Sequence, residues 1–121
     1  MAKTILFIED DLDIQRLYSM KLDAAGFKVL LSVDAEQGLT QLKKQKPDLI
    51  LLDIMLPGKM NGFEFLKTIK EDESLKKIPV VVLTNLDTEK EEALNLGAVD
   101  YIIKANINLN DIVEKVKSYL K

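Results

Sequence analysis

Residues 47–58 read PDLILLDIMLPG, and this stretch decides the fold. Four apolar residues in succession, 49–52, lie between Pro47 and the turn signal Pro57-Gly58. That pattern predicts a short strand buried on both faces. Asp53 follows, at the point where the strand should end. Because open α/β sheets bind ligands outside the carboxyl ends of their strands, Asp53 is the first candidate functional residue.

Composition limits the chemistry that this chain can perform. The 121 residues fit one domain, 1–121, and 47% hydrophobic with 31% charged residues is typical of a globular protein. Seventeen Lys and Arg against twenty Asp and Glu give a net charge of −3, which offers no electrostatic reason for nucleic-acid binding. The lack of cysteine and histidine excludes disulfides, thiolate metal sites and histidine-based catalysis. Carboxylates, hydroxyls, lysine and a hard cation remain.

Neither a membrane span nor a secretory signal is expected. The apolar runs are four or five residues long, against the roughly 20 that a transmembrane helix needs. The N-terminal residues lead directly into the apolar run 5–8 and then into acidic residues, unlike a signal peptide. The sequence therefore predicts a cytoplasmic protein.

Strand-like segments alternate five times with segments of helical period. Strands are expected at residues 5–8, 27–31, 48–53, 79–83 and 99–103, and helices at 11–25, 34–45, 63–70, 88–97 and 108–120. Regular alternation with nearly continuous apolar strands predicts an α/β fold, a doubly wound parallel sheet with helices on both faces.

Local signals predict how the helices begin and which faces they bury. Capping boxes are expected at Asp34 with Gln37 and at Thr88 with Glu91, and Asn108 is expected to cap the last helix. The apolar period also predicts which side chains of three helices face inward. They are Ile14, Leu17, Tyr18, Leu22 and Ala25 in the first, Phe63, Leu66 and Ile69 in the third, and Ile112, Val113, Val116 and Leu120 in the last.

Polar residues follow four of the expected strands. They are Glu9, Asp10 and Asp11 after the first, Asp53 after the third, Thr84 after the fourth and Lys104 after the fifth. Right-handed crossovers bring all these strand ends to one edge of the sheet. Taken singly, the first acids could start a helix, Thr84 could be a turn hydroxyl and Lys104 a solvated lysine. Their joint placement is what favours a functional site.

The expected cluster has the chemistry of a phosphoryl site. Neighbouring carboxylates repel one another unless a cation intervenes, and Mg²⁺ accepts one or two carboxylates while keeping several waters. Together with Lys104 and Thr84, such an ion would match the oxygens of a transferring phosphoryl group. A carboxylate such as Asp53 can act as the nucleophile and form an aspartyl phosphate.

From Lys3 to about Leu120 the chain resembles the receiver domain of two-component response regulators, including the chemotaxis type. The matching stretches are ILFIEDD at 5–11, DIMLPG at 53–58, NGFE at 61–64, VLT at 82–84 and GAVDYIIK at 97–104. The resemblance implies a flavodoxin-like (βα)5 fold with a five-stranded parallel sheet in the order 2-1-3-4-5.

The resemblance also implies roles for particular residues and partners. Asp53 would be the phosphoacceptor, and the Mg²⁺ ligands would be Glu9, Asp10, Asp53 and the Met55 backbone carbonyl. Thr84 would be the switch hydroxyl, Tyr101 the switch aromatic and Lys104 the phosphate-binding lysine. A sensor histidine kinase or phosphotransfer protein would donate the phosphoryl group, and a downstream protein would read it. The domain would bind no nucleic acid and no membrane, and would be a monomer or a phosphorylation-dependent dimer.

Three departures from the family pattern carry expectations of their own. Ala105 stands where proline usually follows the lysine, which predicts a trans bond with a displaced Lys104 or a strained cis bond. Asn85 stands where a small residue is usual, and would crowd the phosphoryl group or donate a hydrogen bond to it. The loop 57–62 is one residue longer than usual and should bulge without loss of chemistry.

Other functions remain open from the sequence. An aspartyl-nucleophile phosphatase would want an acid two residues after the nucleophile, where this chain has Met55. A flavodoxin-like carrier would want hydroxyls and glycines after the first strand, where this chain has three acids. A receiver belonging to a longer transcription factor is also possible, although the sequence of residues 118–121 resembles a natural helix end and slightly favours a free-standing regulator.

Overall fold

The computed structural model describes residues 2–120, in which five strands alternate with five α-helices. The strands are β1 (Thr4–Ile8), β2 (Lys28–Ser32), β3 (Leu49–Leu52), β4 (Val80–Thr84) and β5 (Asp100–Ile103). The helices are α1 (Leu12–Ala24), α2 (Ala35–Lys44), α3 (Gly62–Glu71), α4 (Lys90–Asn95) and α5 (Leu109–Tyr119), with the 3₁₀ turn η1 (Lys104–Asn106) before α5. All pairings are parallel and the order is β2-β1-β3-β4-β5, so the predicted fold class is confirmed.

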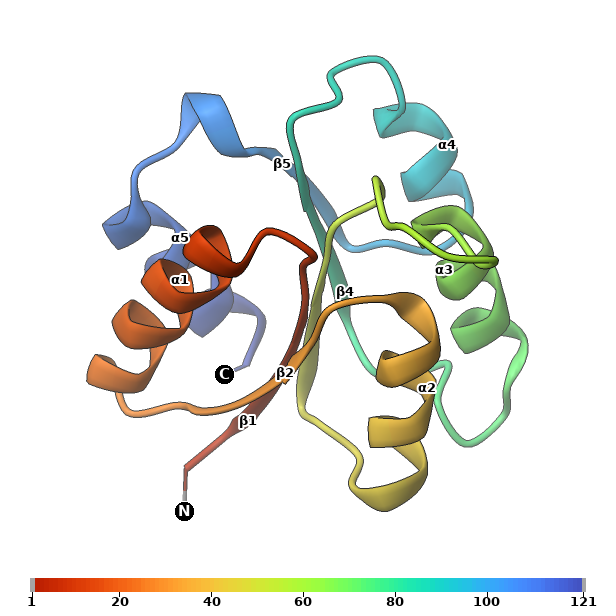
Figure 1. Ribbon diagram of the computed structural model, residues 1–121, viewed down its shortest axis with the longest axis horizontal. Coiled ribbons are helices and arrows are strands. Elements are labelled where there is room, and N and C mark those ends of the chain that lie inside the picture. The colour runs from red at the N-terminus through yellow and green to blue at the C-terminus, as the bar shows by residue number, and fades with distance from the viewer. Residues whose placement is uncertain (1, 121) are drawn as a thin grey trace.

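The sheet is the middle of three layers. Helices α1 and α5 cover one face, and α2, α3 and α4 cover the other (Figure 1). Successive residues of β1 alternate between the two cores, with Phe7 toward α1 and α5 and Leu6 toward α2 and α3. Every residue of β3 is fully buried, which is why its sequence is an uninterrupted apolar run. Among the residues described, no helix has the length and apolar character to cross a membrane.

The register of the central strands positions the functional edge, the upper edge of the sheet in Figure 1. Ile8 at the end of β1 pairs with Leu52 at the end of β3, and the Asp53 N–H donates to the Ile8 carbonyl at 3.1 Å. The residues that follow β1 and β3 are therefore neighbours. Lys104 starts from the end of the edge strand β5 and reaches past β4 toward them.

Side-chain caps fix where most of the helices begin. The Asp34 carboxylate accepts the Gln37 N–H at 2.8 Å, but the Gln37 side chain accepts the Val33 N–H and not that of Asp34, so the expected capping box is only half formed. Asn108 caps α5 through the Asp111 N–H at 2.9 Å. Asn61 and Glu64 form a reciprocal capping box at the start of α3. Asn followed three residues later by Glu is the sequence signature of this box, although the box was not among the predictions.

The capping box expected at Thr88 and Glu91 is wrong. Helix α4 begins after Glu89, whose side chain makes no cap hydrogen bond, and it spans six residues. The Thr88 hydroxyl instead donates to the Glu89 carboxylate at 3.3 Å, so it is not available to the backbone of the helix. Packing of Ala93 against the sheet therefore holds this short helix without a side-chain cap.

Two inward faces differ from the prediction. Leu17 is 54% exposed, whereas Gln15 is buried on the same face of α1 as Tyr18 and Leu22, so the face turns toward positions 15, 18 and 22. In α3, Phe65 is fully buried while Phe63 is only partly buried. In both helices the buried face is rotated by about one residue from the face that the apolar pattern indicates, to Gln15, Tyr18 and Leu22 in α1 and to Gly62, Phe65, Leu66 and Ile69 in α3. The predicted inward positions Ala25 and Leu120 lie at the C-caps of α1 and α5 and are half-buried.

Replacing Gly62 with alanine should destabilise the fold by about 3 kcal/mol, since overpacking against atoms that cannot move is costly. A Cβ at Gly62 would lie 2.4 Å from the Ile54 Cα and 2.8 Å from the Asp53 carbonyl oxygen, both backbone atoms. Urea unfolding measures the loss. An unfolding midpoint equal to that of the wild type would mean that the loop after β3 can move away.

Candidate functional site

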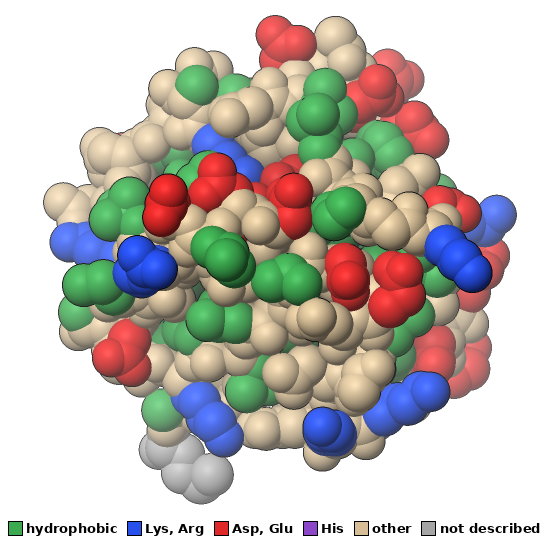
Figure 2. All heavy atoms as spheres, in the orientation of Figure 1, with side chains coloured by type: hydrophobic (Ala, Val, Ile, Leu, Met, Phe, Trp, Pro, Cys, Tyr) green, Lys and Arg blue, Asp and Glu red, His purple; other side chains and the backbone are tan. Residues whose placement is uncertain are grey.

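Three carboxylates meet at the functional edge. One oxygen each from Glu9, Asp10 and Asp53 lies within 4.8 Å of the others. Glu9 is 1% exposed and Asp53 5% exposed, while Asp10 is open to solvent. Figure 2 shows acidic side chains gathered over this upper part of the molecule. Two of the three carboxylates are thus buried and one is accessible to solvent, and all the side-chain atoms that the cluster offers to a metal are oxygens.

The Lys104 ammonium lies against two of these carboxylates. It donates to Asp53 Oδ2 at 3.0 Å and also to Glu9 Oε1. The lysine side chain is 8% exposed, so the contacts are largely desolvated. Residues separated by 51 and 95 positions in the chain are joined here by one cation.

Backbone donors and a buried amide orient the carboxylates. Asp53 Oδ1 accepts the Met55 N–H at 2.9 Å, and Glu9 Oε2 accepts the Asp11 N–H at 3.1 Å. The Gln15 amide donates to the backbone carbonyls of Glu9 and Ser32 at 3.2 and 3.1 Å. Gln15 was not among the predicted site residues, and only its polarity at an inward position of the helix could have indicated it.

The charges of the cluster are incompletely balanced, because two buried carboxylates share one ammonium. Burial raises the pKa of Glu9 above its ordinary value of 4.5, against the opposing influence of Lys104. For Lys104, burial alone would lower the pKa, but the hydrogen bond to Glu9 and the charge of Asp53 hold that pKa above its ordinary value. A hard divalent cation would supply the missing charge, and an all-oxygen carboxylate set with one open side fits Mg²⁺.

The Glu9 pKa predicts how stability depends on pH. The folded state keeps a proton on Glu9 at pH values where the unfolded state has lost it. The stabilisation of the fold by this proton is therefore fully present below pH 4.5 and is lost as the pH rises through the raised pKa of Glu9. A tenfold change in the proton affinity of one group corresponds to about 1.4 kcal/mol.

Glu9→Gln, which cannot titrate, should therefore gain stability relative to the wild type as the pH rises in the presence of a chelator. Urea unfolding from pH 4.5 to about pH 7.5 measures the difference between the two proteins. Glu73→Gln is the matched control, because the Glu73 side chain is 87% exposed, and it should run parallel to the wild type. Parallel profiles for Glu9→Gln would contradict the prediction.

Thr84 and Tyr101 meet at the backbone of one residue. Thr84 Oγ1 accepts the Leu86 N–H at 3.4 Å, and the Tyr101 hydroxyl donates to the Leu86 carbonyl at 2.5 Å. Thr84 is fully buried at the end of β4, and Tyr101 is 6% exposed. The structure thus has Tyr101 already turned inward, with the loop after β4 lying between the two side chains.

At the three departures from the family pattern, the bond before Ala105 is trans, as one branch of the expectation had it, and the expectations for the position of Lys104 and for Asn85 are wrong. All peptide bonds among the described residues are trans, and Lys104 reaches the carboxylates, so the expected displacement does not occur. Asn85 neither crowds the cluster nor donates to it in this structure: its Oδ1 accepts the Ala105 N–H at 3.0 Å. The loop 57–62 turns at Gly58 (φ +95°) and closes with a hydrogen bond from the Gly62 N–H to the Ile54 carbonyl.

Comparison with known proteins places this arrangement in a family. The response regulator receiver domain family matches residues 5–117, almost the whole chain. The chain therefore belongs to the response regulator receiver domains, a family of signalling proteins, and the resemblance seen in the sequence is confirmed.

Among its relatives, the phosphate regulon transcriptional regulatory protein PhoB of Pseudomonas aeruginosa is 36% identical over 123 residues. That match covers 100% of this chain and 53% of PhoB, so the chain spans about half the length of the PhoB proteins it matches. The polar-differentiation response regulator DivK of Brucella ovis is 31% identical, with 99% of this chain and 98% of DivK covered. The structure of the phosphorylated cyanobacterial phytochrome response regulator RcpA matches this chain with a TM-score of 0.85 at 32% identity. The match covers 99% of this chain and 94% of the RcpA chain.

Proposed function

We propose that this protein is a phosphorylation switch in which Asp53 accepts a phosphoryl group from a histidine kinase or phosphotransfer protein. The observation that carries the proposal is the convergence of Glu9, Asp10 and Asp53 within 4.8 Å, with Lys104 bonded to two of them. The phosphorylated state of the related RcpA supports it.

In the proposed reaction the phosphoryl group moves from a donor nitrogen to an oxygen of Asp53. A carboxylate oxygen of Asp53 attacks phosphorus, the bond from phosphorus to the donor imidazole nitrogen breaks, and its electron pair stays on that nitrogen. The Met55 N–H holds one Asp53 oxygen at 2.9 Å, which leaves the other to face the donor once Lys104 moves off it. Lys104 then compensates the charge of the transferred group.

Glu9, Asp10, Asp53 and the Met55 backbone carbonyl would hold Mg²⁺. The ion would supply positive charge toward the phosphoryl oxygens and offset the repulsion between the carboxylates. Asp10 is the exposed member of the cluster and would be the ligand that the ion reaches first from solvent. Thr84 would donate its hydroxyl to a phosphoryl oxygen.

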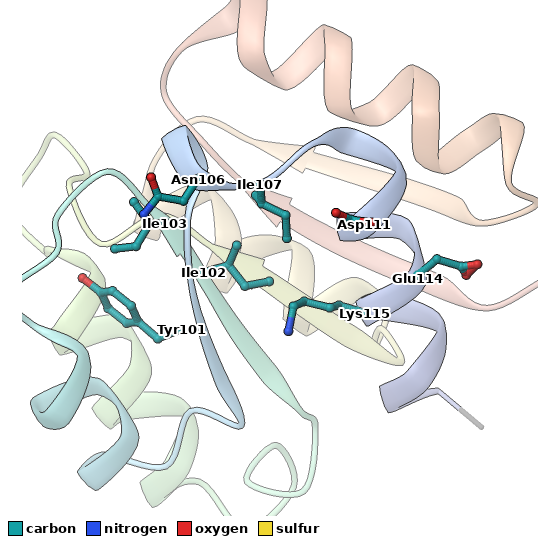
Figure 3. A pocket seen from close by; sticks show the side chains of 8 residues that line it. All are labelled: Tyr101, Ile102, Ile103, Asn106, Ile107, Asp111, Glu114 and Lys115. Carbon is teal, nitrogen blue, oxygen red and sulfur yellow. The ribbon is translucent and has the colours of Figure 1, made fainter.

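The output would be a change at the surface made by α4, β5 and α5. An aspartyl phosphate replaces one negative charge with roughly two and adds acceptor oxygens. If Thr84 turns toward them, its contact with the Leu86 N–H is lost, and the loop that also receives the Tyr101 hydroxyl is repositioned. Tyr101 is one of the residues that border a hollow beside β5 and α5, and its ring lies on the side of β5 away from α5 (Figure 3), so a change in the loop would reach the surface on the α4 side of β5.

The partners follow from the proposed role. A phosphohistidine-bearing protein would dock over the carboxylate cluster, and a downstream protein, or a second copy of the chain after phosphorylation, would bind the α4-β5-α5 surface. Without phosphorylation the domain, taken as residues 1–121, would be a monomer in the cytoplasm. We propose no nucleic-acid or membrane partner for it, because the net charge is −3.

The test is intact mass after incubation with acetyl phosphate. With Mg²⁺ the protein should gain one phosphoryl group, and with a chelator it should gain none. Hydroxylamine, which cleaves acyl phosphates, should remove the group. Continuous hydrolysis of acetyl phosphate with no adduct would instead favour a phosphatase, and no reaction at all would contradict the proposal.

Loss of the phosphoryl group should be slow, on a scale of minutes or longer. The resemblance gives the positions two past Asp53 and two past Thr84 an influence on hydrolysis, and Met55 and Leu86 have no polar group to orient a water. Met55→Asn and Leu86→Glu should change the rate of self-dephosphorylation by several-fold, measured as decay of the adduct mass. Decay at the wild-type rate in both variants would count against this assignment.

A further inference from the structure

One hydrogen bond joins the residues that directly follow Thr84 and Lys104. The Ala105 N–H donates to Asn85 Oδ1 at 3.0 Å, although the two residues are 20 positions apart. The pairing of β4 with β5 ends at Thr84 and Ile103, so this bond extends the contact between the two segments one step past the sheet. It ties together the two backbone segments that carry the hydroxyl and the ammonium of the site.

Apart from this bond, few contacts hold the backbone of the segment that begins with Lys104 against the loop after β4. Lys104 is the first residue of η1, which has no side-chain cap. Within residues 2–120, the bond to Asn85 is the one hydrogen bond that joins η1 to the loop after β4. Because lysine carries its charge on a flexible four-carbon stem, the position of its backbone limits where the ammonium can go.

We propose that Asn85 is a positioning residue for phosphoryl transfer, which holds the backbone of Lys104 at a fixed place relative to Thr84. This inference rests on the proposed function. Before transfer, the bonds to Glu9 and Asp53 hold the ammonium whether or not Asn85 is present. During transfer the ammonium must leave Asp53 for a phosphoryl oxygen, and the backbone anchor then determines its reach.

A small error in that reach matters, since misplacement by about 1 Å can cost about 10²-fold in rate. Asn85→Ala should therefore lower the maximal rate of phosphorylation by acetyl phosphate about 3- to 10-fold, the effect of one hydrogen bond. The Mg²⁺ concentration for half-maximal rate should not change, because Asn85 touches none of the carboxylates. The midpoint of urea unfolding should also be unchanged, because Asn85 and Ala105 are both exposed. Hydrogen exchange at the Ala105 amide should become faster.

Two variants serve as controls. Asn106→Ala removes an exposed amide from the same turn (Figure 3), and Ala105→Gly keeps the N–H; both should react at the wild-type rate. Three results would overturn the positioning role alone. Asn85→Ala could react as fast as Asn106→Ala, it could lose stability to urea together with rate, or it could lose rate without faster exchange of the Ala105 amide. Failure of the wild type to gain a phosphoryl group would overturn the proposed function itself.

Discussion

Asp53→Asn should abolish phosphoryl incorporation, with a loss of at least about 10³-fold, the scale on which enzymes lose rate when the nucleophile is removed. The electron pair of the amide nitrogen is delocalised into the carbonyl, and the amide oxygen is a far weaker nucleophile than a carboxylate. Intact mass after incubation with acetyl phosphate and Mg²⁺ measures the result.

This variant should remain folded, so the loss cannot come from unfolding. The side-chain oxygen of asparagine can still accept the Met55 N–H, and Lys104 keeps its bond to Glu9. Removing one of two buried negative charges also relieves their repulsion. Asp48→Asn is a matched control at the other end of β3, where the carboxylate accepts the Thr4 N–H at 2.7 Å, and it should be phosphorylated normally. Full phosphorylation of Asp53→Asn would place the acceptor elsewhere.

Lys104→Met should lower both stability and phosphorylation rate. It leaves Glu9 and Asp53 buried without their ammonium, and breaking a buried ion pair typically costs about 3–5 kcal/mol. Because protonation of Glu9 can relieve part of this, we expect a loss of about 2–3 kcal/mol near neutral pH with a chelator, and less at lower pH. Urea unfolding measures the loss, and added Mg²⁺ should recover part of it. The phosphorylation rate should fall about 10²- to 10³-fold, as when one preorganised charge-stabilising donor is removed.

Lys115→Met is the control for this experiment. Its ammonium pairs with Asp100 at 3.5 Å and its side chain is 47% exposed, so its removal should cost less than about 1 kcal/mol. Neither Mg²⁺ dependence nor phosphorylation should change in this variant. If Lys104→Met were as stable as Lys115→Met in the presence of a chelator, the carboxylates would have to be balanced without Lys104.

The sequence by itself determined the alternating α/β architecture and which charged groups gather at one edge of the sheet. The residues of β3 and β4 are buried along their whole length, and such strands must be continuous apolar runs that are visible in the sequence. Once a parallel sheet is predicted, residues after its strands must share one edge, which brought Asp10, Asp53 and Lys104 together before any coordinates. The reason is that these features depend on local pattern and on the handedness of the connections.

Only the tertiary structure decided how the charges of the carboxylate cluster are paired and how its side chains are held in place. The Lys104 ammonium pairs with Glu9 and Asp53 among the three acids of the cluster, Gln15 lies in place of Leu17 on the inner face of α1, and Asn85 accepts the Ala105 N–H. Each depends on how a side chain meets a distant segment after packing, so the residue types and their local spacing carry no record of it. The sequence therefore determined which groups gather at the edge of the sheet, and the packed structure determined which of them are buried, paired and fixed in place.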